Sequence, residues 1–163
     1  MSLVIFICTA NMCRSPMAEG ILKHRLSELA RDDILVSSMG THGVEGYSAT
    51  ELAIEVCRQN SIDISSHKSR HLIGGELASS DLIFVMEPVH KEFLNVFFPQ
   101  VHQQTFLLGS WPGKESRKEK IKDPVGGKYD AYQKAFQSLH YHINRIIPFI
   151  LTRFPQSIPH TFR

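Results

Sequence analysis

Short apolar runs and longer amphipathic stretches alternate along this chain. The apolar runs lie at residues 3–7, 34–38, 81–86 and 105–109, and they predict four strands. The first of them, LVIFI, is an unbroken β-branched and aromatic run, which is typical of a strand buried on both faces. Strands that alternate with helices predict an α/β fold in which helices cover both faces of a parallel sheet.

The amphipathic stretches follow the strands and predict the helices. Ser15 and Pro16 fit the start of the first helix, because a serine can cap a helix and a proline suits its first turn. Further helices are expected over 48–60, from about 88 to 97 and from after 127 to about 154, with a loop at 110–122. The last helix should be interrupted or kinked near Pro148. We therefore expect one domain over 1–154 and a loosely ordered C-terminal tail over 155–163.

Composition and charge narrow the class of protein. The 163 residues are one domain's length, and 18 basic against 16 acidic side chains give a net charge of +2, which argues against a nucleic-acid binder that relies on bulk charge. No apolar stretch is long enough to span a membrane, and MSLVIFI is too short for a signal peptide. Nine histidines form no cluster with metal spacing, so we expect neither a metal nor another cofactor. Three cysteines do not form a secreted disulfide framework, and we expect a cytoplasmic protein with free thiols.

The segment CTANMCRSP directly follows the first predicted strand. In parallel α/β sheets, ligands bind where strands end and helices begin. A loop from Cys8 to Arg14 can curl so that its backbone N–H groups point inward and hold an anion, with the helix dipole adding to the attraction. The planar guanidinium of Arg14 can close this ring on two phosphate oxygens. The same surroundings favour a thiolate at Cys8, to which the Ser15 hydroxyl can donate a hydrogen bond.

A thiolate beneath a bound phosphate indicates one class of reaction. The sulfur attacks phosphorus in line, and water then hydrolyses the cysteinyl-phosphate. An acid must protonate the leaving group, and Asp123, in the segment DPVGG, is the candidate. Taken singly, Cys8 could be a buried thiol, Arg14 a surface charge and Asp123 part of a turn. Their combination, with a strand before and a helix after, points to a phosphatase, and the lack of a Gly-Lys-Ser/Thr ending disfavours a nucleotide-binding loop.

Six segments carry a resemblance to a known family: CTANMCRSPMAE, SSMGT, SHKSR (66–70), DLIFVME (81–87), FLLGSW (106–111) and DP (123–124). With these segments the chain resembles the low-molecular-weight protein tyrosine phosphatases over nearly its whole length. The resemblance implies a three-layer fold with a four-stranded parallel sheet. It also implies a cysteine nucleophile, a phosphate-binding arginine and an aspartic acid that donates a proton, which match Cys8, Arg14 and Asp123.

The resemblance also implies roles for the rest of the loop and for its supports. The expected supports are Asn11, a residue type that tolerates a left-handed backbone, together with Ser38 and His67. Cys13 matches a second loop cysteine that can form a reversible disulfide with the nucleophile, which would stop oxidation at a recoverable state; a small packed thiol is the alternative. The residues expected to bind phosphate are Thr9, Ala10, Asn11, Met12, Cys13 and Ser15.

Several positions depart from the family pattern and bear on the substrate. Ala10 replaces the usual loop glycine, which requires a negative φ at that position. Val125 stands where phosphotyrosine-specific members carry an aromatic residue after Asp-Pro, and Val44 stands at the second aromatic wall, with Tyr47 nearby. Met12 is apolar, as in tyrosine phosphatases, whereas DPVGG resembles the arginine-phosphatase branch.

These features lead to a first reading and to alternatives. We expect an enzyme that hydrolyses phosphoprotein monoesters, and phosphotyrosine is the favoured substrate. The alternative is a protein arginine phosphatase of the same fold. The altered walls and Ala10 leave open a catalytically weak phosphate-binding module, and Cys8 with Cys13 leaves open a thiol redox protein. The expected partner is a phosphorylated protein or peptide, neither nucleic acid nor a membrane, and the sequence does not determine the oligomeric state.

Overall fold

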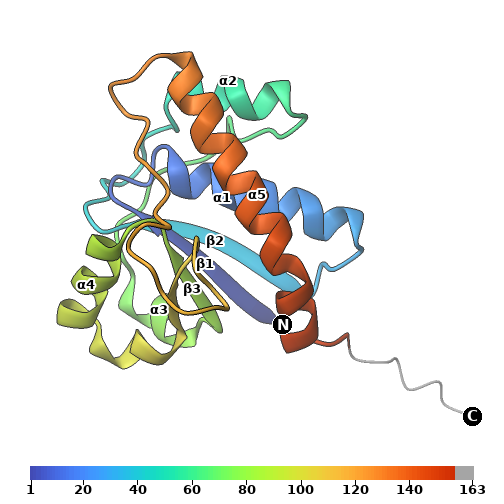
Figure 1. Ribbon diagram of the computed structural model, residues 1–163, viewed down its shortest axis with the longest axis vertical. Coiled ribbons are helices and arrows are strands. Elements are labelled where there is room, and N and C mark those ends of the chain that lie inside the picture. Colours follow the sequence, from blue (N-terminus) through green and yellow to red (C-terminus); the bar gives the residue numbers. More distant parts are fainter. Residues whose placement is uncertain (157–163) are drawn as a thin grey trace, which may run out of the picture.

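The computed structural model of the protein describes residues 1–156 and contains one parallel sheet (Figure 1). Its four strands are β1 (Ser2–Cys8), β2 (Ile34–Gly40), β3 (Leu82–Val85) and β4 (Thr105–Leu107), and they lie in the order β2-β1-β3-β4. Every pair of neighbours is parallel. The α/β fold and the four-stranded parallel sheet expected from the sequence are therefore confirmed.

Helices cover both faces of this sheet. They are α1 (Arg14–Glu28), α2 (Glu51–Gln59), α3 (Gly74–Ser79), α4 (Pro88–Phe97) and α5 (Tyr129–Arg153), with a 3₁₀ helix over Pro99–Gln104. Figure 1 shows α1 and α5 over one face and α3 and α4 over the other, and α2 packs against α5. The result is the three-layer arrangement that alternating strands and helices predict.

The central strand β1 explains why the core has two halves. Successive side chains of a strand point to opposite faces, and the four residues from Val4 to Ile7 are all 0 % exposed. Val4 and Phe6 pack beneath α1 and α5, whereas Ile5 and Ile7 pack against α3 and α4. The LVIFI run therefore contributes to both halves of the core. Full burial of each such side chain stabilises the fold by about 2 kcal/mol.

The structure differs from the sequence-based expectation at several points. Helix α1 begins at Arg14, and no side chain caps it; the expected cap at Ser15 is wrong, because the Ser15 hydroxyl binds within the preceding loop instead. Helix α5 continues through Pro148 as one element, since buried residues on both sides of the proline hold it in place. Helix α3 and the 3₁₀ helix were not expected.

The structure does not test the expected boundary between the domain and the C-terminal tail. Residues 155 and 156 follow α5 without regular structure, and the remainder of the expected tail, 157–163, lies outside the described residues. The division into a domain over 1–154 and a tail stays a prediction. Across residues 1–156, no helix combines the length and the apolar character that crossing a bilayer requires.

The carboxyl ends of the strands bring the site together. Cys8, the last residue of β1, lies in register with Gly40, the last residue of β2. On the other side, Ile7 pairs with Val85 at the end of β3. Because all four strands are parallel, the loops that follow them meet at this edge of the sheet.

Candidate active site

The loop that joins β1 to α1 lies directly against β2. Cys8 is 3 % exposed at the base of this loop, and Thr9 is exposed at its rim. A Cβ atom at Gly40 would lie 2.5 Å from the carbonyl oxygen of Thr9 and 2.9 Å from the backbone nitrogen of Asn11. Glycine at position 40 therefore lets the loop fold down onto the neighbouring strand.

The backbone N–H groups of this loop are unpaired. Within residues 1–156, none of the N–H groups of residues 9–15 donates a hydrogen bond to another group of the protein. Asn11, Cys13, Arg14 and Ser15 are buried residues, whereas Thr9 and Ala10 are exposed. A buried polar group without a partner costs about 1–3 kcal/mol. Consecutive unpaired N–H groups at a helix N-terminus are typical of an anion-binding site.

Asn11 holds the loop in its conformation. Its φ of 58° is left-handed, which asparagine tolerates better than most residues. Its Nδ2 donates to Ser15 Oγ at 2.8 Å and to Ser38 Oγ at 2.9 Å, and its Oδ1 accepts from the backbone N–H of Arg70 at 2.9 Å. His67 Nε2 lies 2.8 Å from the Asn11 carbonyl oxygen. The structure thus brings the predicted supports Ser38 and His67 to the same residue.

Ser15 joins Asn11 to the cysteine. Its Oγ lies 3.0 Å from Cys8 Sγ. This oxygen accepts a hydrogen bond from Asn11, and its hydroxyl can donate to the Cys8 sulfur or to the Met39 carbonyl oxygen, which lies farther away at 3.5 Å. A hydroxyl that donates to sulfur stabilises the thiolate over the thiol.

Arg14 is buried beneath the loop and held by two carboxylates. It is 2 % exposed, and its Nη1 donates to the Ile121 carbonyl oxygen at 2.9 Å. Glu87 Oε1 lies 3.2 Å from Nη1, and Asp123 Oδ2 lies 3.3 Å from Nη2. A buried guanidinium needs such partners, and these fix its plane at the end of the sheet.

Asp123 stands on the long loop between β4 and α5. Its side chain is 43 % exposed. Its Oδ1 accepts the backbone N–H of Val125 at 3.0 Å, which forms a local turn. The carboxyl group is thus held close to Arg14 and still reaches solvent. The structure brings together the two charged residues expected to act with Cys8.

Glu87 and His90, which follow β3, also contact the loop residues Arg14 and Thr9, although neither was expected from the sequence. His90 Nε2 lies 2.9 Å from Thr9 Oγ1, and His90 Nδ1 accepts the backbone N–H of Glu87 at 3.1 Å, so Nε2 carries the proton. Burial and then the nearby Arg14 charge lower the pKa of His90 to about 4. The sequence could have indicated both residues, because they lie in the segment MEPVH, which follows a buried strand at the same edge of the sheet as Cys8.

Burial disfavours the thiolate form of the other two cysteines. Burial, followed by the charge of Cys8, raises the pKa of Cys13 far above its usual range. Burial also raises the pKa of Cys57 to about 12. All three cysteines are free and buried. Cys13 and Cys57 thus stay protonated and pack as small apolar side chains.

Several residues that depart from the family pattern can be compared with the structure. Among the described non-glycine residues, positive φ angles occur at Asn11, Ala30 and Ser61, so the negative φ required at Ala10 is confirmed. Val44, Tyr47 and Val125 are 60 %, 57 % and 61 % exposed. Two aliphatic side chains and one tyrosine at these positions are therefore open to solvent.

Comparison with known proteins identifies the family. The family model for low molecular weight phosphotyrosine protein phosphatase matches residues 3–152. A probable low molecular weight protein-tyrosine-phosphatase, EpsP of Ralstonia nicotianae, is 30 % identical over 145 residues, which are 89 % of this chain and 93 % of EpsP.

Solved structures agree with this assignment. The low molecular weight protein tyrosine phosphatase from T. tengcongensis superposes with a TM-score of 0.85 at 33 % identity, over 91 % of this chain and 99 % of the other. The YwlE arginine phosphatase from Geobacillus stearothermophilus superposes with a TM-score of 0.84 at 26 % identity, over 97 % and 100 % of the two chains. The chain therefore belongs to the low-molecular-weight phosphotyrosine protein phosphatases, a family of cysteine-dependent enzymes.

Proposed function

We propose that Cys8 is the nucleophile and that the reaction passes through a cysteinyl-phosphate. The observation that carries this proposal is the set of unpaired N–H groups in residues 9–15, the loop that directly follows Cys8. A phosphate oxygen is a strong acceptor, so a dianion can satisfy several of these donors at once. The residues proposed to bind it are Thr9, Ala10, Asn11, Met12, Cys13 and Ser15.

In the first step the Cys8 thiolate attacks phosphorus. An S–P bond forms, the P–O bond to the substrate breaks, and the leaving oxygen takes its electron pair. Arg14 and the loop N–H groups stabilise the charge on the equatorial oxygens in the transition state. Arg14 suits this role because its planar fork can donate to two oxygens and its position is fixed by Glu87.

Asp123 acts as the acid and then as the base. Its proton goes to the leaving oxygen in the first step. In the second step the carboxylate takes a proton from water, the water oxygen attacks phosphorus, and the S–P bond breaks to restore the thiolate. The exposure of Asp123 beside buried Arg14 supports this assignment, because the acid must reach both substrate and solvent.

Phosphotyrosine in a protein or peptide is the proposed substrate. Family membership favours it, and Met12 gives the loop an apolar side chain that a phenyl ring can contact. The experiment compares the hydrolysis of a phosphotyrosyl peptide by the wild type, Cys8→Ser and the control Cys57→Ser. We expect Cys8→Ser to lose turnover and Cys57→Ser to keep it; turnover by Cys8→Ser would contradict the proposal.

Phosphoarginine is a second candidate substrate. Val125 and the glycines after it form an open wall without an aromatic ring, which favours a flexible side chain over a flat one. The likeness to the YwlE arginine phosphatase supports the same candidate. Values of kcat/KM on matched phosphotyrosyl and phosphoarginyl peptides decide between them. A higher value on phosphotyrosine supports the first proposal, and a higher value on phosphoarginine replaces it with the second.

A further inference from the structure

Residues 66–71 form a segment that is hydrogen-bonded to Asn11 of the candidate active-site loop. The backbone N–H of Arg70 donates to Asn11 Oδ1 at 2.9 Å, and the Arg70 carbonyl oxygen accepts the N–H of Gly40 at 3.0 Å. His67 Nε2 adds its contact with the Asn11 carbonyl oxygen at 2.8 Å. The conformation of Asn11 therefore depends on where the main chain of this segment lies.

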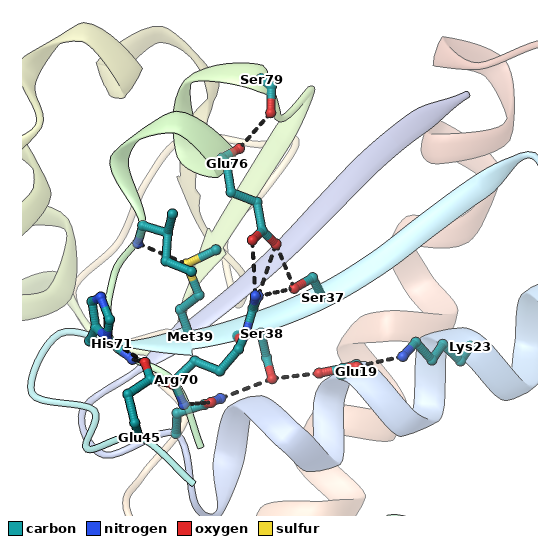
Figure 2. A network of polar contacts seen from close by, with 12 residues as sticks. Glu19, Lys23, Ser37, Ser38, Met39, Glu45, Arg70, His71, Glu76 and Ser79 are labelled. Atoms are coloured by element: carbon teal, nitrogen blue, oxygen red, sulfur yellow. Dashed lines mark hydrogen bonds and ion pairs between the residues drawn. The ribbon is translucent and has the colours of Figure 1, made fainter. Parts of the chain in front are cut away.

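The side chain of Arg70 reaches away from the loop. Figure 2 shows its guanidinium directed across β2 toward Glu76 of α3. Nη1 and Nη2 each lie 2.9 Å from one of the Glu76 carboxylate oxygens, and Nη2 also contacts Ser37 Oγ. Ser37 Oγ in turn donates to Glu76 Oε1 at 2.9 Å. The charge of Arg70 thus fixes the place of its own backbone.

The pair is only partly screened by solvent. Arg70 and Glu76 are 30 % and 26 % exposed. Their mutual hydrogen bonds are the main reason that the pKa of Arg70 is raised and the pKa of Glu76 is lowered. A bidentate arginine–carboxylate pair of this kind fixes both distance and direction.

Two adjacent serines of β2 connect this pair to the far side of the sheet. Their side chains point to opposite faces. Ser37 contacts Arg70 and Glu76, whereas Ser38 Oγ accepts from Asn11 and donates to Glu19 Oε2 at 2.5 Å (Figure 2). The Asn11 amide is thus held by Ser38 at Nδ2 and, at Oδ1, by the Arg70 main chain, which lies beside the end of β2 at Gly40.

We propose that the Arg70–Glu76 ion pair positions Asn11 and, through Asn11, the anion-binding loop. The proposal rests on the proposed function of that loop. When Glu76 is lost, the Arg70 side chain keeps only its neutral contacts with Ser37 Oγ and the Ser38 carbonyl oxygen, and we expect its backbone N–H to shift away from Asn11 Oδ1. The amide then no longer directs Nδ2 at Ser15, and the hydrogen bond from Ser15 to the Cys8 sulfur weakens. Arg70 and Glu76 are positioning residues, because neither touches the substrate.

The experiment measures three properties of Glu76→Ala and of the milder Glu76→Gln. They are kcat/KM on an aryl phosphate, the inhibition constant of inorganic phosphate, and the pH midpoint of Cys8 alkylation by iodoacetate. We expect Glu76→Ala to lower kcat/KM roughly 10- to 100-fold, which is the size of effect that a small misplacement of catalytic groups produces. Phosphate should bind more weakly and the alkylation midpoint should move to higher pH, with smaller changes in the same directions for Glu76→Gln.

Glu55→Ala is the matched control. Glu55 makes a similar two-point pair with Arg58 on α2, but this pair contacts no part of the loop. The control should leave all three properties unchanged. If folded Glu76 variants behave like Glu55→Ala, the proposal is overturned.

A double-mutant cycle tests the route. Asn11→Gly removes the amide and tolerates the positive φ at this position. If Glu76 acts through Asn11, then Glu76→Ala adds little to the loss already caused by Asn11→Gly; additive losses would contradict the route. A wild type without turnover would contradict the proposed function alone, since phosphate protection of Cys8 against iodoacetate still reports on the positioning of the loop.

Discussion

Arg14 Nη2 lies 3.3 Å from Asp123 Oδ2, although 109 residues separate the two along the chain. Arg14 begins α1, and Asp123 stands in the loop before α5. A phosphate that binds Arg14 competes with Asp123 for the same guanidinium. If Arg14 binds the substrate phosphate as proposed, we expect the anion to displace the Asp123 carboxyl from Arg14 and to leave it able to protonate the leaving group.

This relationship predicts a leaving-group dependence for Asp123→Asn. We expect kcat on phenyl phosphate to fall about 100-fold or more, because phenolate is a poor leaving group that needs the proton. On p-nitrophenyl phosphate the first step should be slowed much less. Asp130→Asn, an exposed carboxylate in the first turn of α5, serves as the control and should change neither rate. Equal losses on both substrates would contradict the role of Asp123 as the acid.

His90 predicts a loss of stability in mild acid. It is 2 % exposed, and burial, the Arg14 charge and the His42 charge lower its pKa to about 4, with Asp123 acting in the opposite direction. The unfolded chain therefore binds more protons at His90 between about pH 6.5 and pH 4, and the free energy of unfolding falls as the pH falls through this window. His90 should account for a loss of about 2 kcal/mol between pH 7 and pH 5.

Urea unfolding of the wild type and of His90→Asn at several pH values checks this. Between pH 7 and pH 5, the free energy of unfolding of His90→Asn should fall by about 2 kcal/mol less than that of the wild type. His24→Asn, on the exposed side of α1, should keep the wild-type slope. Identical slopes in wild type and His90→Asn would show that His90 does not stay neutral when the protein folds.

Gly40→Ala should impair the loop without touching a charged group. Its Cβ would meet the backbone of Thr9 at 2.5 Å, and backbone atoms cannot move aside cheaply. We expect kcat/KM to fall roughly 10-fold or more and the free energy of unfolding to fall by about 1–3 kcal/mol. Gly75→Ala in α3 is the control, because its Cβ would meet nothing within 4 Å. Wild-type kinetics in Gly40→Ala would argue against the tight packing of the loop on β2.

Cys13 predicts how the enzyme responds to peroxide. Its raised pKa keeps it a thiol, so Cys8 should be oxidised first, to a sulfenic acid with release of water. Attack by Cys13 on that sulfur would release a second water and form a disulfide that thiol reductants reverse. We expect wild-type activity to return after dithiothreitol and that of Cys13→Ser to be lost for good, with Cys57→Ser as the control. Equal recovery of all three proteins would count against protection by Cys13.

The sequence predicted the parts of this protein that local patterns determine. The run from Leu3 to Ile7 predicted a doubly buried strand, and Cys8 and Arg14 at its end predicted an anion site. Helix α3 was missed because it has six residues, starts with two glycines and buries only Leu77. The 3₁₀ helix was missed for a similar reason, since it starts at Pro99 and buries only Val101.

Contacts between distant segments could not be predicted from such patterns. No periodicity indicates that Glu87 pairs with Arg14, or that the Arg70 main chain meets Asn11. The prediction that Ser15 caps α1 was wrong for the same reason. The Ser15 hydroxyl forms hydrogen bonds with Cys8 and Asn11 instead of capping the helix. Tertiary structure decides which of several polar partners a side chain takes.

The proposed covalent intermediate can be observed directly. We expect Asp123→Asn to slow the water step more than the attack on p-nitrophenyl phosphate, so the phosphoenzyme should accumulate and survive an acid quench. Mass spectrometry of the quenched protein should find one phosphate on the peptide that contains Cys8, and tandem fragmentation should place it on that sulfur. Phosphate release without any adduct, or an adduct on another residue, would contradict the assignment of Cys8 as the nucleophile.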